Sequence, residues 1–328
     1  MARYPDTFII GAPKSGTTSL YEHLRGHPQV FLPSVKEPCY FARDLARDIA
    51  GSFMVHDRDR ETYLALFEGA GDARRVGEGS TRYLYSHDAP ALIREVQPQA
   101  RIVAMLRNPV DMIYSLHDHK LAGGTEDVAD FAQALALEDE RRAGRRLPPM
   151  SNPLLATYTD RARFGEQLAR WLEVFPREQL HVMIFEDFLA RPAAEFGRLL
   201  EFLGLDPAYR PASFAAHNIA HGTRSLRLRA VLHSRPAQWL AWRALPRLIG
   251  EARTHRLVRA VAQSPLRRRR SRRVALSVEL RQRLEAELAP DVERLGELLG
   301  RDLRELWFGR PAVAQAPAEV EPEAATLS

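Results

Sequence analysis

The sequence predicts a single α/β domain in which helices flank a central parallel β-sheet. Two observations support this fold class. Short apolar segments alternate with helical patterns along the chain, and two of those segments end in polar loops that lead directly into helices. The predicted strands are residues 7–11, 75–78, 101–107 and 181–185. Strands that alternate with helices form a parallel sheet covered on both faces.

The first of these loops is the stretch GAPKSGTTSL, which begins at Gly11. A β-branched and aromatic run, Thr7–Ile10, precedes it, and residues 17–25 have the pattern of a helix. This order points the N–H groups and the positive dipole end of the helix at the loop, which suits a bound anion. The residues predicted to bind the anion are Lys14, Ser15, Gly16, Thr17 and Thr18.

The position of the lysine separates this loop from that of an ATPase or kinase. The phosphate-binding loop of those enzymes has the pattern G-x-x-x-x-G-K-[ST], with lysine directly after the second glycine. Here Thr17 follows Gly16, and Lys14 stands two residues before that glycine. A nucleoside triphosphatase or kinase is therefore disfavoured.

The second loop ends the strand at residues 101–107 with Arg107-Asn108-Pro109, before a helical pattern that carries Ser115. Eight residues separate Arg107 from Ser115, enough for a turn plus two helical turns, so both side chains are able to reach one phosphate. A ligand with two phosphate groups needs two anion sites on one sheet edge. The loops at the carboxyl ends of parallel strands supply such sites.

Together these motifs resemble the sulfotransferases that use 3′-phosphoadenosine 5′-phosphosulfate (PAPS). PKSGTT after a hydrophobic strand resembles their 5′-phosphosulfate loop, and LRNPVDMIYS resembles their 3′-phosphate site. The resemblance extends over roughly residues 6–308 and implies a P-loop-like sulfotransferase fold with PAPS as co-substrate. Because the sulfuryl group carries a single negative charge and the motifs contain no metal-ligand cluster, we expect no metal. The resemblance implies Lys14 as a catalytic residue and the following nucleotide ligands: Lys14, Ser15, Gly16, Thr17, Thr18, Arg107, Ser115 and, within a basic loop at 222–227, Arg224.

The resemblance also implies a catalytic base that takes a proton from the acceptor hydroxyl or amine. In the heparan-type and bacterial members an acidic residue after the first helix serves this role, and the matching residue is Glu37. The rivals are Glu78 after a strand, and His117 or His119 on the helix of the 3′-phosphate site. The acidic pair at 186–187 is interpreted as structural.

Two departures from the family pattern affect the acceptor side. Gly79 stands where heparan-type members often carry a lysine, and Phe164 stands where the family has a tyrosine before a helix. The acceptor is expected to be a carbohydrate, a glycolipid or a small metabolite.

Composition and length limit the remaining possibilities. The chain has 328 residues, 45% of them hydrophobic, which suits one large core, and we expect one domain over residues 1–310 with a disordered Pro/Ala/Glu-rich tail at 311–328. A single cysteine, Cys39, suits a reducing compartment. Neither a signal peptide nor a transmembrane segment is evident, so we expect a cytoplasmic protein.

Residues 224–273 differ in composition from the rest of the chain. They contain 15 arginines and one glutamate, together with Trp239 and Trp242. This pattern is typical of a segment that binds an anionic membrane surface or an acidic polymer, and equally of a solvated basic surface over packed tryptophans. No nucleic-acid-binding motif accompanies it, so we do not expect a nucleic-acid partner.

A second unusual segment, Ala122–Pro149, is polar and contains Gly123-Gly124. It is interpreted as a flexible excursion that covers the acceptor.

Two other function classes remain as alternatives to a PAPS-dependent sulfotransferase. One is an atypical P-loop kinase, which predicts dependence on ATP and magnesium. The other is a membrane-surface protein without enzymatic activity that retains the nucleotide-binding fold, which the arginine-rich segment favours.

Overall fold

A computed structural model of the protein describes residues 3–45, 59–148, 151, 153–214 and 275–309. Its strands form one five-stranded sheet in the order β2-β3-β1-β4-β5, and every pairing is parallel. The strands are β1 (Thr7–Gly11), β2 (Val30–Phe31), β3 (Arg75–Gly79), β4 (Arg101–Leu106) and β5 (Leu180–Ile184). The predicted fold class is confirmed, and the two-residue edge strand β2 is an addition to the four predicted strands.

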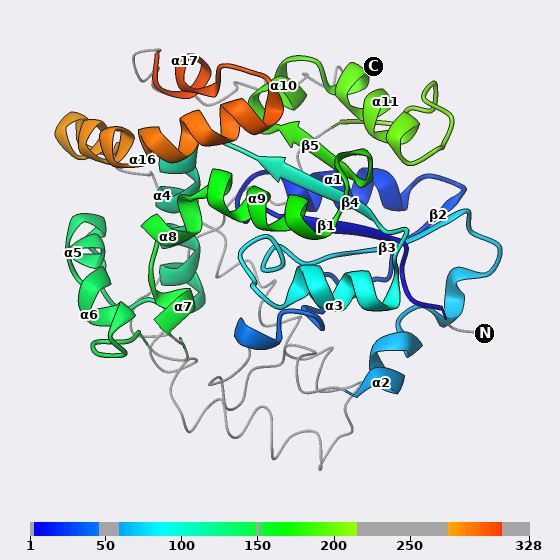
Figure 1. Ribbon diagram of the computed structural model, residues 1–328, viewed down its shortest axis with the longest axis horizontal. Helices are drawn as coiled ribbons and strands as arrows, with labels where there is room; N and C mark the ends of the chain where they lie inside the picture. The colour runs from blue at the N-terminus through cyan, green and yellow to red at the C-terminus, as the bar shows by residue number, and fades with distance from the viewer. Residues whose placement is uncertain (1–2, 46–58, 149–150, 152, 215–274, 310–328) are drawn as a thin grey trace, which may run out of the picture.

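Helices cover both faces of this sheet (Figure 1). One face is covered by α1 (Thr17–Arg25), α10 (Phe185–Ala190) and α11 (Pro192–Phe202), and the other by α3 (Ala89–Val96), α4 (Pro109–Gly123) and α9 (Phe164–Val174). The remaining α-helices described are α2 (Arg60–Ala65), α5 (Phe131–Ala136), α6 (Glu138–Arg142), α7 (Pro153–Ala156), α8 (Thr159–Ala162), α16 (Val278–Leu299) and α17 (Leu303–Phe308).

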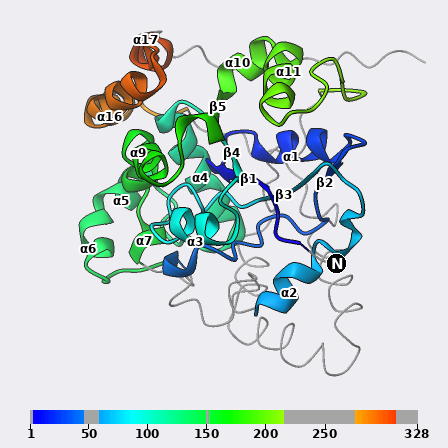
Figure 2. The same ribbon diagram turned by 45° about the vertical axis from the view of Figure 1, so that its right-hand side comes forward.

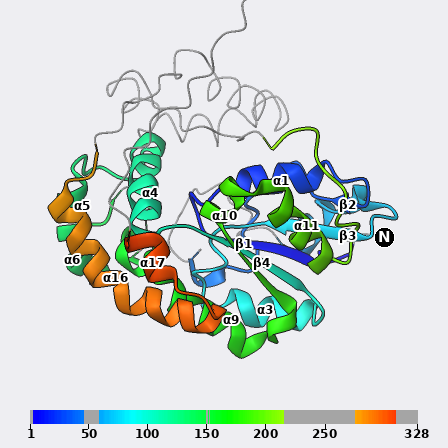
Figure 3. The ribbon, with the colours of Figure 1, turned by 90° about the horizontal axis from the view of Figure 1, so that it is seen from above.

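The two layers follow from the alternation of side chains along the strands. Phe8 and Ile10 of β1 belong to the core under α3 and α9, whereas Ile9 belongs to the core under α1 and α11. Successive residues of a strand point to opposite faces of the sheet, so a strand that is apolar throughout is buried on both sides. Figure 3 shows the sheet between these two helical layers.

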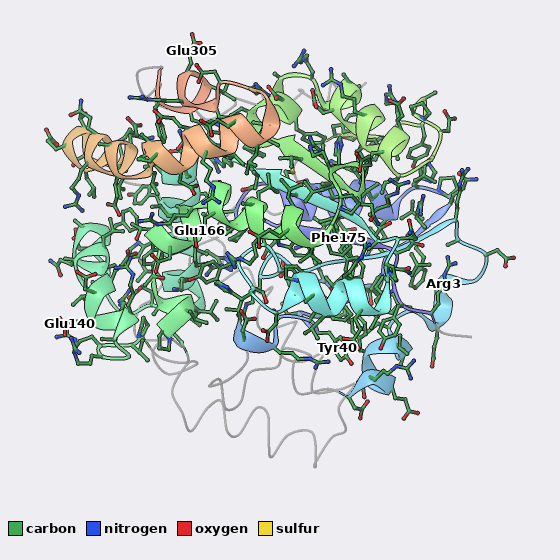
Figure 4. The ribbon with its side chains drawn as sticks, in the orientation of Figure 1. Arg3, Tyr40, Glu140, Glu166, Phe175 and Glu305 are labelled. Atoms are coloured by element: carbon green, nitrogen blue, oxygen red, sulfur yellow. The ribbon has the colours of Figure 1, made fainter. Side chains whose placement is uncertain are left out.

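The last two helices that the structure describes, α16 and α17, belong to the core under α3 and α9, although they are far from those helices in sequence. α16 packs against α9 and α4, and α17 packs against α16. Figure 2 shows α16 and α17 on one side of the sheet, and α10 and α11 on the other. Charged residues such as Glu166 and Glu305 lie on the outer surface, whereas Phe175 is fully buried (Figure 4).

The prediction of a flexible excursion at residues 122–149 is wrong for the part that the structure describes. Residues 131–142 form α5 and α6, and a fully buried ion pair anchors them, with Arg141 Nη2 at 2.8 Å from Glu126 Oε1. The hydroxyl of Tyr158 donates to the same carboxylate at 2.7 Å. A buried, hydrogen-bonded ion pair holds a segment in one arrangement, because separating its members leaves a charge unpaired.

Several predictions fall on residues outside the described part of the chain. These are Arg224 with its basic loop, the arginine-rich segment 224–273 and the tail at 311–328. The predicted domain boundary at residue 310 follows the last described residue, Gly309. Among the described residues, no helix combines the length and apolar character needed to cross a membrane.

Candidate nucleotide and acceptor site

The loop between β1 and α1 has the backbone of an anion site. Gly16 is the N-cap of α1 in the left-handed conformation (φ 86°), and no side chain caps the helix start. Lys14 also has a positive φ of 60°, which is uncommon for a residue with a side chain. A Cβ atom at Gly16 would lie 2.9 Å from the ring of Phe185, so glycine is required both for conformation and for space. The uncapped N–H groups of the first turn therefore remain available to a phosphate.

The hydroxyl residues of this loop differ in exposure. Ser15 and Thr17 are buried, while Lys14, Gly16 and Thr18 are half-buried. The Ser15 hydroxyl donates a long hydrogen bond, 3.4 Å, to the Pro13 carbonyl. A phosphate oxygen is a stronger acceptor than this distant carbonyl, so the hydroxyl is able to turn to a ligand.

Arg107 lies beside this loop, at the end of β4. Its Nη1 donates to the Lys14 carbonyl at 3.4 Å, and its guanidinium stacks 5.0 Å from the ring centre of Phe185. Phe185 therefore contacts both Gly16 and Arg107 and fixes their spacing. The two predicted anion sites are adjacent, as a ligand with two phosphate groups requires. Ser115 lies further along α4 and is half-buried.

A hydrogen-bond network holds the turn after Arg107. Asn108 caps α4, because its Oδ1 accepts from the N–H groups of Val110 and Asp111. Its amide nitrogen donates to the Trp307 carbonyl at 2.7 Å. Glu186 accepts from the Asn108 N–H and from the Trp307 indole, both at 3.1 Å. The helix α17 thus positions the turn after Arg107.

The acidic pair after β5 has the structural role that the sequence predicts. Glu186 belongs to the network around Asn108, and Asp187 forms an ion pair with Arg301. Both carboxylates are thereby occupied by partners in distant parts of the chain.

A chain of charges links Arg107 to α16. Asp111 Oδ2 lies 3.9 Å from Arg107 Nη2, and Asp111 Oδ1 lies 2.6 Å from Arg281 Nη2. Arg281 also reaches Glu285 at 3.6 Å. Because Arg281 holds Asp111 more closely than Arg107 does, it reduces the competition of Asp111 with a phosphate for Arg107.

Glu37 has the exposure and the contacts expected of a positioned carboxylate. It has a positive φ of 64°, a strained conformation for such a residue. Lys36 Nζ lies 2.6 Å from Oε1, and the Thr81 N–H donates to Oε2 at 2.8 Å. The Thr81 hydroxyl lies within 3.2 Å of both oxygens. Its side chain is 29% exposed, so an acceptor is able to reach the carboxylate.

The structure excludes Glu78 as a base that touches an acceptor. Its side chain is fully buried and accepts hydrogen bonds from three hydroxyls, those of Tyr63 (2.6 Å), Ser80 (2.7 Å) and Tyr83 (2.8 Å). Burial raises the pKa of Glu78 to about 7, against the effect of these hydrogen bonds. Through its hydrogen bonds with Ser80 and Tyr83, this residue of β3 holds the loop that carries Thr81.

The two histidines of α4 differ in the same way. His117 is buried, its Nε2 lies 2.9 Å from the Val128 carbonyl, and burial lowers its pKa. It is a core residue. His119 has an exposed side chain that interacts electrostatically with Lys14 and Glu37. Its partial desolvation and then the charge of Lys14 shift the pKa of His119 downwards, so the ring is neutral at pH 7 and remains a rival base.

The two departures from the family pattern, Gly79 and Phe164, are both explained by packing. A Cβ atom at Gly79 would lie 2.9 Å from the ring of Tyr21, so this tyrosine occupies the space that a side chain would need. The Tyr21 hydroxyl donates to the Pro33 carbonyl at 2.6 Å. Phe164 is buried in the core under α9. Among the described residues there is no cluster of His, Cys, Asp or Glu arranged to hold a metal ion.

Comparison with known proteins identifies the family. The model of the sulfotransferase domain matches residues 4–217, more than half of the 328 residues. The chain belongs to the sulfotransferase domain family. A sulfotransferase from Alicyclobacillus acidocaldarius has a similar crystal structure, with a TM-score of 0.68 and 28% identity, over 93% of this chain and 98% of that one. The predicted family is confirmed.

The curated relatives of this sulfotransferase-family chain act on carbohydrates, as their names state. The chain is 28% identical over 209 residues to heparan sulfate glucosamine 3-O-sulfotransferase 6 of Mus musculus, covering 62% of this chain and 53% of that protein. It is 29% identical over 252 residues to carbohydrate sulfotransferase 15 of Homo sapiens, covering 62% and 44%. The chain thus spans about half the length of these relatives.

Some residues of the site were not predicted from the sequence. Phe185, Thr81, Asp111 and Arg281 contact the predicted residues from other elements. Phe185 follows β5 directly, and its position at the carboxyl end of a predicted strand was a usable signal. Arg281 carried none, because an arginine on a polar helix face is typical of a solvated surface.

Proposed function

We propose that this protein transfers a sulfuryl group from PAPS to a hydroxyl or amine of an acceptor, with a carbohydrate as the favoured acceptor class. The observation that carries the proposal is the contact between the two anion sites, where Arg107 donates to the carbonyl of Lys14. Family membership and the carbohydrate relatives support it.

The nucleotide side supplies charge and orientation. Bound PAPS supplies an activated sulfuryl group whose leaving group is a phosphate. The N–H groups of the first turn of α1 and the hydroxyls of Thr17 and Thr18 would hold the 5′-phosphate, and Arg107 with Ser115 would hold the 3′-phosphate. Lys14 would neutralise the negative charge that grows on the bridging oxygen as the bond to sulfur breaks. A mobile ammonium suits this role better than a planar guanidinium.

The acceptor side supplies the base. Glu37 would accept the proton of the attacking hydroxyl while the new bond to sulfur forms. Thr81 and Lys36 hold its carboxylate in one orientation, which reduces the loss of freedom in the transition state.

A direct test combines ligand binding with product analysis. We expect 3′,5′-bisphosphoadenosine (PAP) to raise the melting temperature of the protein, and ATP with magnesium to leave it unchanged. Incubation with PAPS and a set of carbohydrate extracts should then yield products that gain one sulfonate by mass spectrometry, with chelators present or absent. Stabilisation by ATP and magnesium alone would favour the kinase alternative, and binding of neither nucleotide would contradict the proposal.

We also propose, as the sequence predicts, that the protein is located in the cytoplasm. Contact with an anionic membrane surface or an acidic polymer would come from residues 224–273, which lie outside the described part. Cell fractionation before and after deletion of that segment tests both statements.

A further inference from the structure

Arg161, in the short helix α8, is a buried arginine whose charge is not paired within the described residues. It is 8% exposed. In the part of the chain that the structure describes, its Nε has no hydrogen-bond partner, and Arg161 belongs to none of the ion pairs there. A buried cation without a partner is costly, so a protein that keeps one has a use for the charge.

The second buried arginine of this region shows the usual arrangement. Arg141 places both terminal nitrogens on Glu126, at 2.8 and 2.9 Å, and reaches the Ala156 carbonyl at 3.1 Å. Its charge is thus neutralised inside the fold. Arg161 follows only five residues after Ala156 and lacks any equivalent of Glu126 among the described residues.

Arg161 lies next to the candidate acceptor side. α8 packs against α4, the helix that carries His119. The guanidinium lies 6.0 Å from the ring centre of Tyr85, in the segment that follows Thr81, the partner of Glu37. Arg161 also interacts electrostatically with Glu37 and with His119, and burial lowers its pKa to about 10, which leaves it charged at pH 7.

Neighbouring charges increase the positive potential at this place. Arg82 interacts electrostatically with Arg161, as does Lys120, although burial lowers the pKa of Lys120 to about 7 and so reduces its charge at pH 7. Lys120 is 7% exposed, its Nζ donates to the Leu155 carbonyl at 2.6 Å, and it lies 4.7 Å from the ring centre of Tyr158. Glu37 is a carboxylate that interacts electrostatically with Arg161, and Lys36 already pairs with it.

We propose that Arg161 binds an anionic group of the acceptor, a carboxylate or a sulfate, close to the hydroxyl or amine that Glu37 deprotonates. The inference rests on the proposed function, since it defines the acceptor as a negatively charged molecule. A guanidinium binds either anion through two parallel hydrogen bonds, and the acceptor would supply the opposite charge that Arg161 lacks among the described residues. Pairing of this kind also orients the acceptor hydroxyl towards Glu37.

The test uses the full chain saturated with PAP and three probes in ligand-observed NMR titrations. The probes are methyl β-glucuronide, methyl β-glucoside 6-sulfate and the uncharged methyl β-glucoside. We expect at least one charged glycoside to bind about tenfold or more tightly than the neutral one, because a charge-assisted hydrogen bond in a dry site has this effect. The charged probe that binds more tightly shows whether the site prefers a carboxylate or a sulfate.

Arg161→Gln should reduce this difference to about twofold or less, with PAP affinity unchanged. The matched control is Arg163→Gln, two residues further along and half-buried, which should keep the preference. Arg161→Met, which keeps the buried stem without its charge, should also lose the preference and raise the melting temperature of the ligand-free protein.

Three results would overturn the inference. They are equal binding of charged and neutral glycosides to the unaltered protein, a preference that persists in Arg161→Gln, and a lower melting temperature of Arg161→Met, which would mark a structural role. Failure of the proposed function is distinguishable, because it appears as a lack of PAP binding, and the glycoside comparison repeated without PAP still tests Arg161 in that case.

Discussion

The nucleotide side and the acceptor side of the site are stabilised by different kinds of contact. On the candidate nucleotide side, Arg107 and Asn108 are held by the loop before α1, by α10 and α17 and, through Asp111, by α16, so that segments up to 199 residues apart in sequence meet there. On the acceptor side, Glu37 is held by its neighbour Lys36 and by Thr81, and Arg161 has no ion-pair partner among the described residues.

This difference indicates what each half binds. A site whose donors are already oriented suits a ligand of constant shape, because little reorganisation accompanies binding. A site that keeps unpaired charge suits a ligand that supplies the opposite charge. Five substitutions test the distinction, from the largest expected effect to the smallest.

Lys14→Ala should lower the turnover by about a hundredfold or more, since loss of a charge contact to a developing oxyanion costs roughly 3 kcal/mol in the transition state. The measurement is the initial rate of PAP release. Far-UV circular dichroism should be unchanged, because Lys14 lies in a loop and is half-buried. Lys14→Arg is the control for charge alone. Near-normal turnover of Lys14→Ala would contradict the assigned role.

Glu37→Gln should lower the turnover by roughly a hundredfold, because the amide keeps the shape but accepts no proton. PAP affinity should stay within about threefold, since the change lies on the acceptor side. His119→Ala, assayed with the same acceptor, is the comparison. If His119→Ala loses activity while Glu37→Gln keeps it, the base is the histidine and the acceptor side departs from the family pattern.

Arg107→Ala should weaken PAP by about 10- to 150-fold, the effect of one charged hydrogen bond of roughly 1.5–3 kcal/mol. Adenosine 5′-phosphosulfate, which lacks the 3′-phosphate, should lose far less. Calorimetry measures both, with Arg101→Ala at the start of the same strand as the control. Equal losses for the two ligands would remove Arg107 from the 3′-phosphate site.

Glu78→Gln tests a buried carboxyl that supports the acceptor side without touching it. Burial raises its pKa from 4.5 to about 7, so the folded protein holds a proton that the unfolded chain has already released between these values. The stability that Glu78 contributes below pH 4.5 is therefore lost as the pH rises through 7, at most about 3 kcal/mol. Urea unfolding at pH 5 to 8 should show a flatter profile for Glu78→Gln than for the exposed control Glu61→Gln. Parallel profiles would refute the shift.

Arg281→Gln should weaken PAP by about two- to fivefold, because Asp111 is then free to compete for Arg107. Adding Asp111→Asn should restore the affinity, which a loss of helix packing would not permit. Arg283→Gln, on the same helix and exposed, is the matched control. Failure of Asp111→Asn to rescue would assign Arg281 to stability alone.

Much of the backbone on the candidate nucleotide side could be predicted from the sequence because the patterns that determine it are local. The strand, the glycine turn and the helix start that are predicted to bind the 5′-phosphate lie within Thr7–Arg25, and Arg107 with its proline turn lies at the end of β4. Strand propensity, glycine conformation and helix-end hydrogen bonding each depend on a few neighbouring residues, so the sequence pattern predicts them directly.

The choice among carboxylates and histidines could not be made from the sequence. Glu37 and Glu78 both occur near short apolar segments, and only the fold buries Glu78 beneath three hydroxyls while it leaves Glu37 accessible. The flexible interpretation of residues 122–149 failed for the same reason. Polar composition does not reveal that Arg141 and Glu126 pair inside the fold.

The sequence by itself determined the family, the parallel sheet and the two strand-to-helix turns proposed as anion sites, since each depends on short-range backbone chemistry. Only the tertiary structure decided which titratable groups reach the site, how α16 and α17 support the turn after Arg107, and that the charge of Arg161 is unpaired among the described residues. Burial and charge pairing depend on contacts between distant segments. A local sequence pattern does not determine how close two such segments lie in the folded protein.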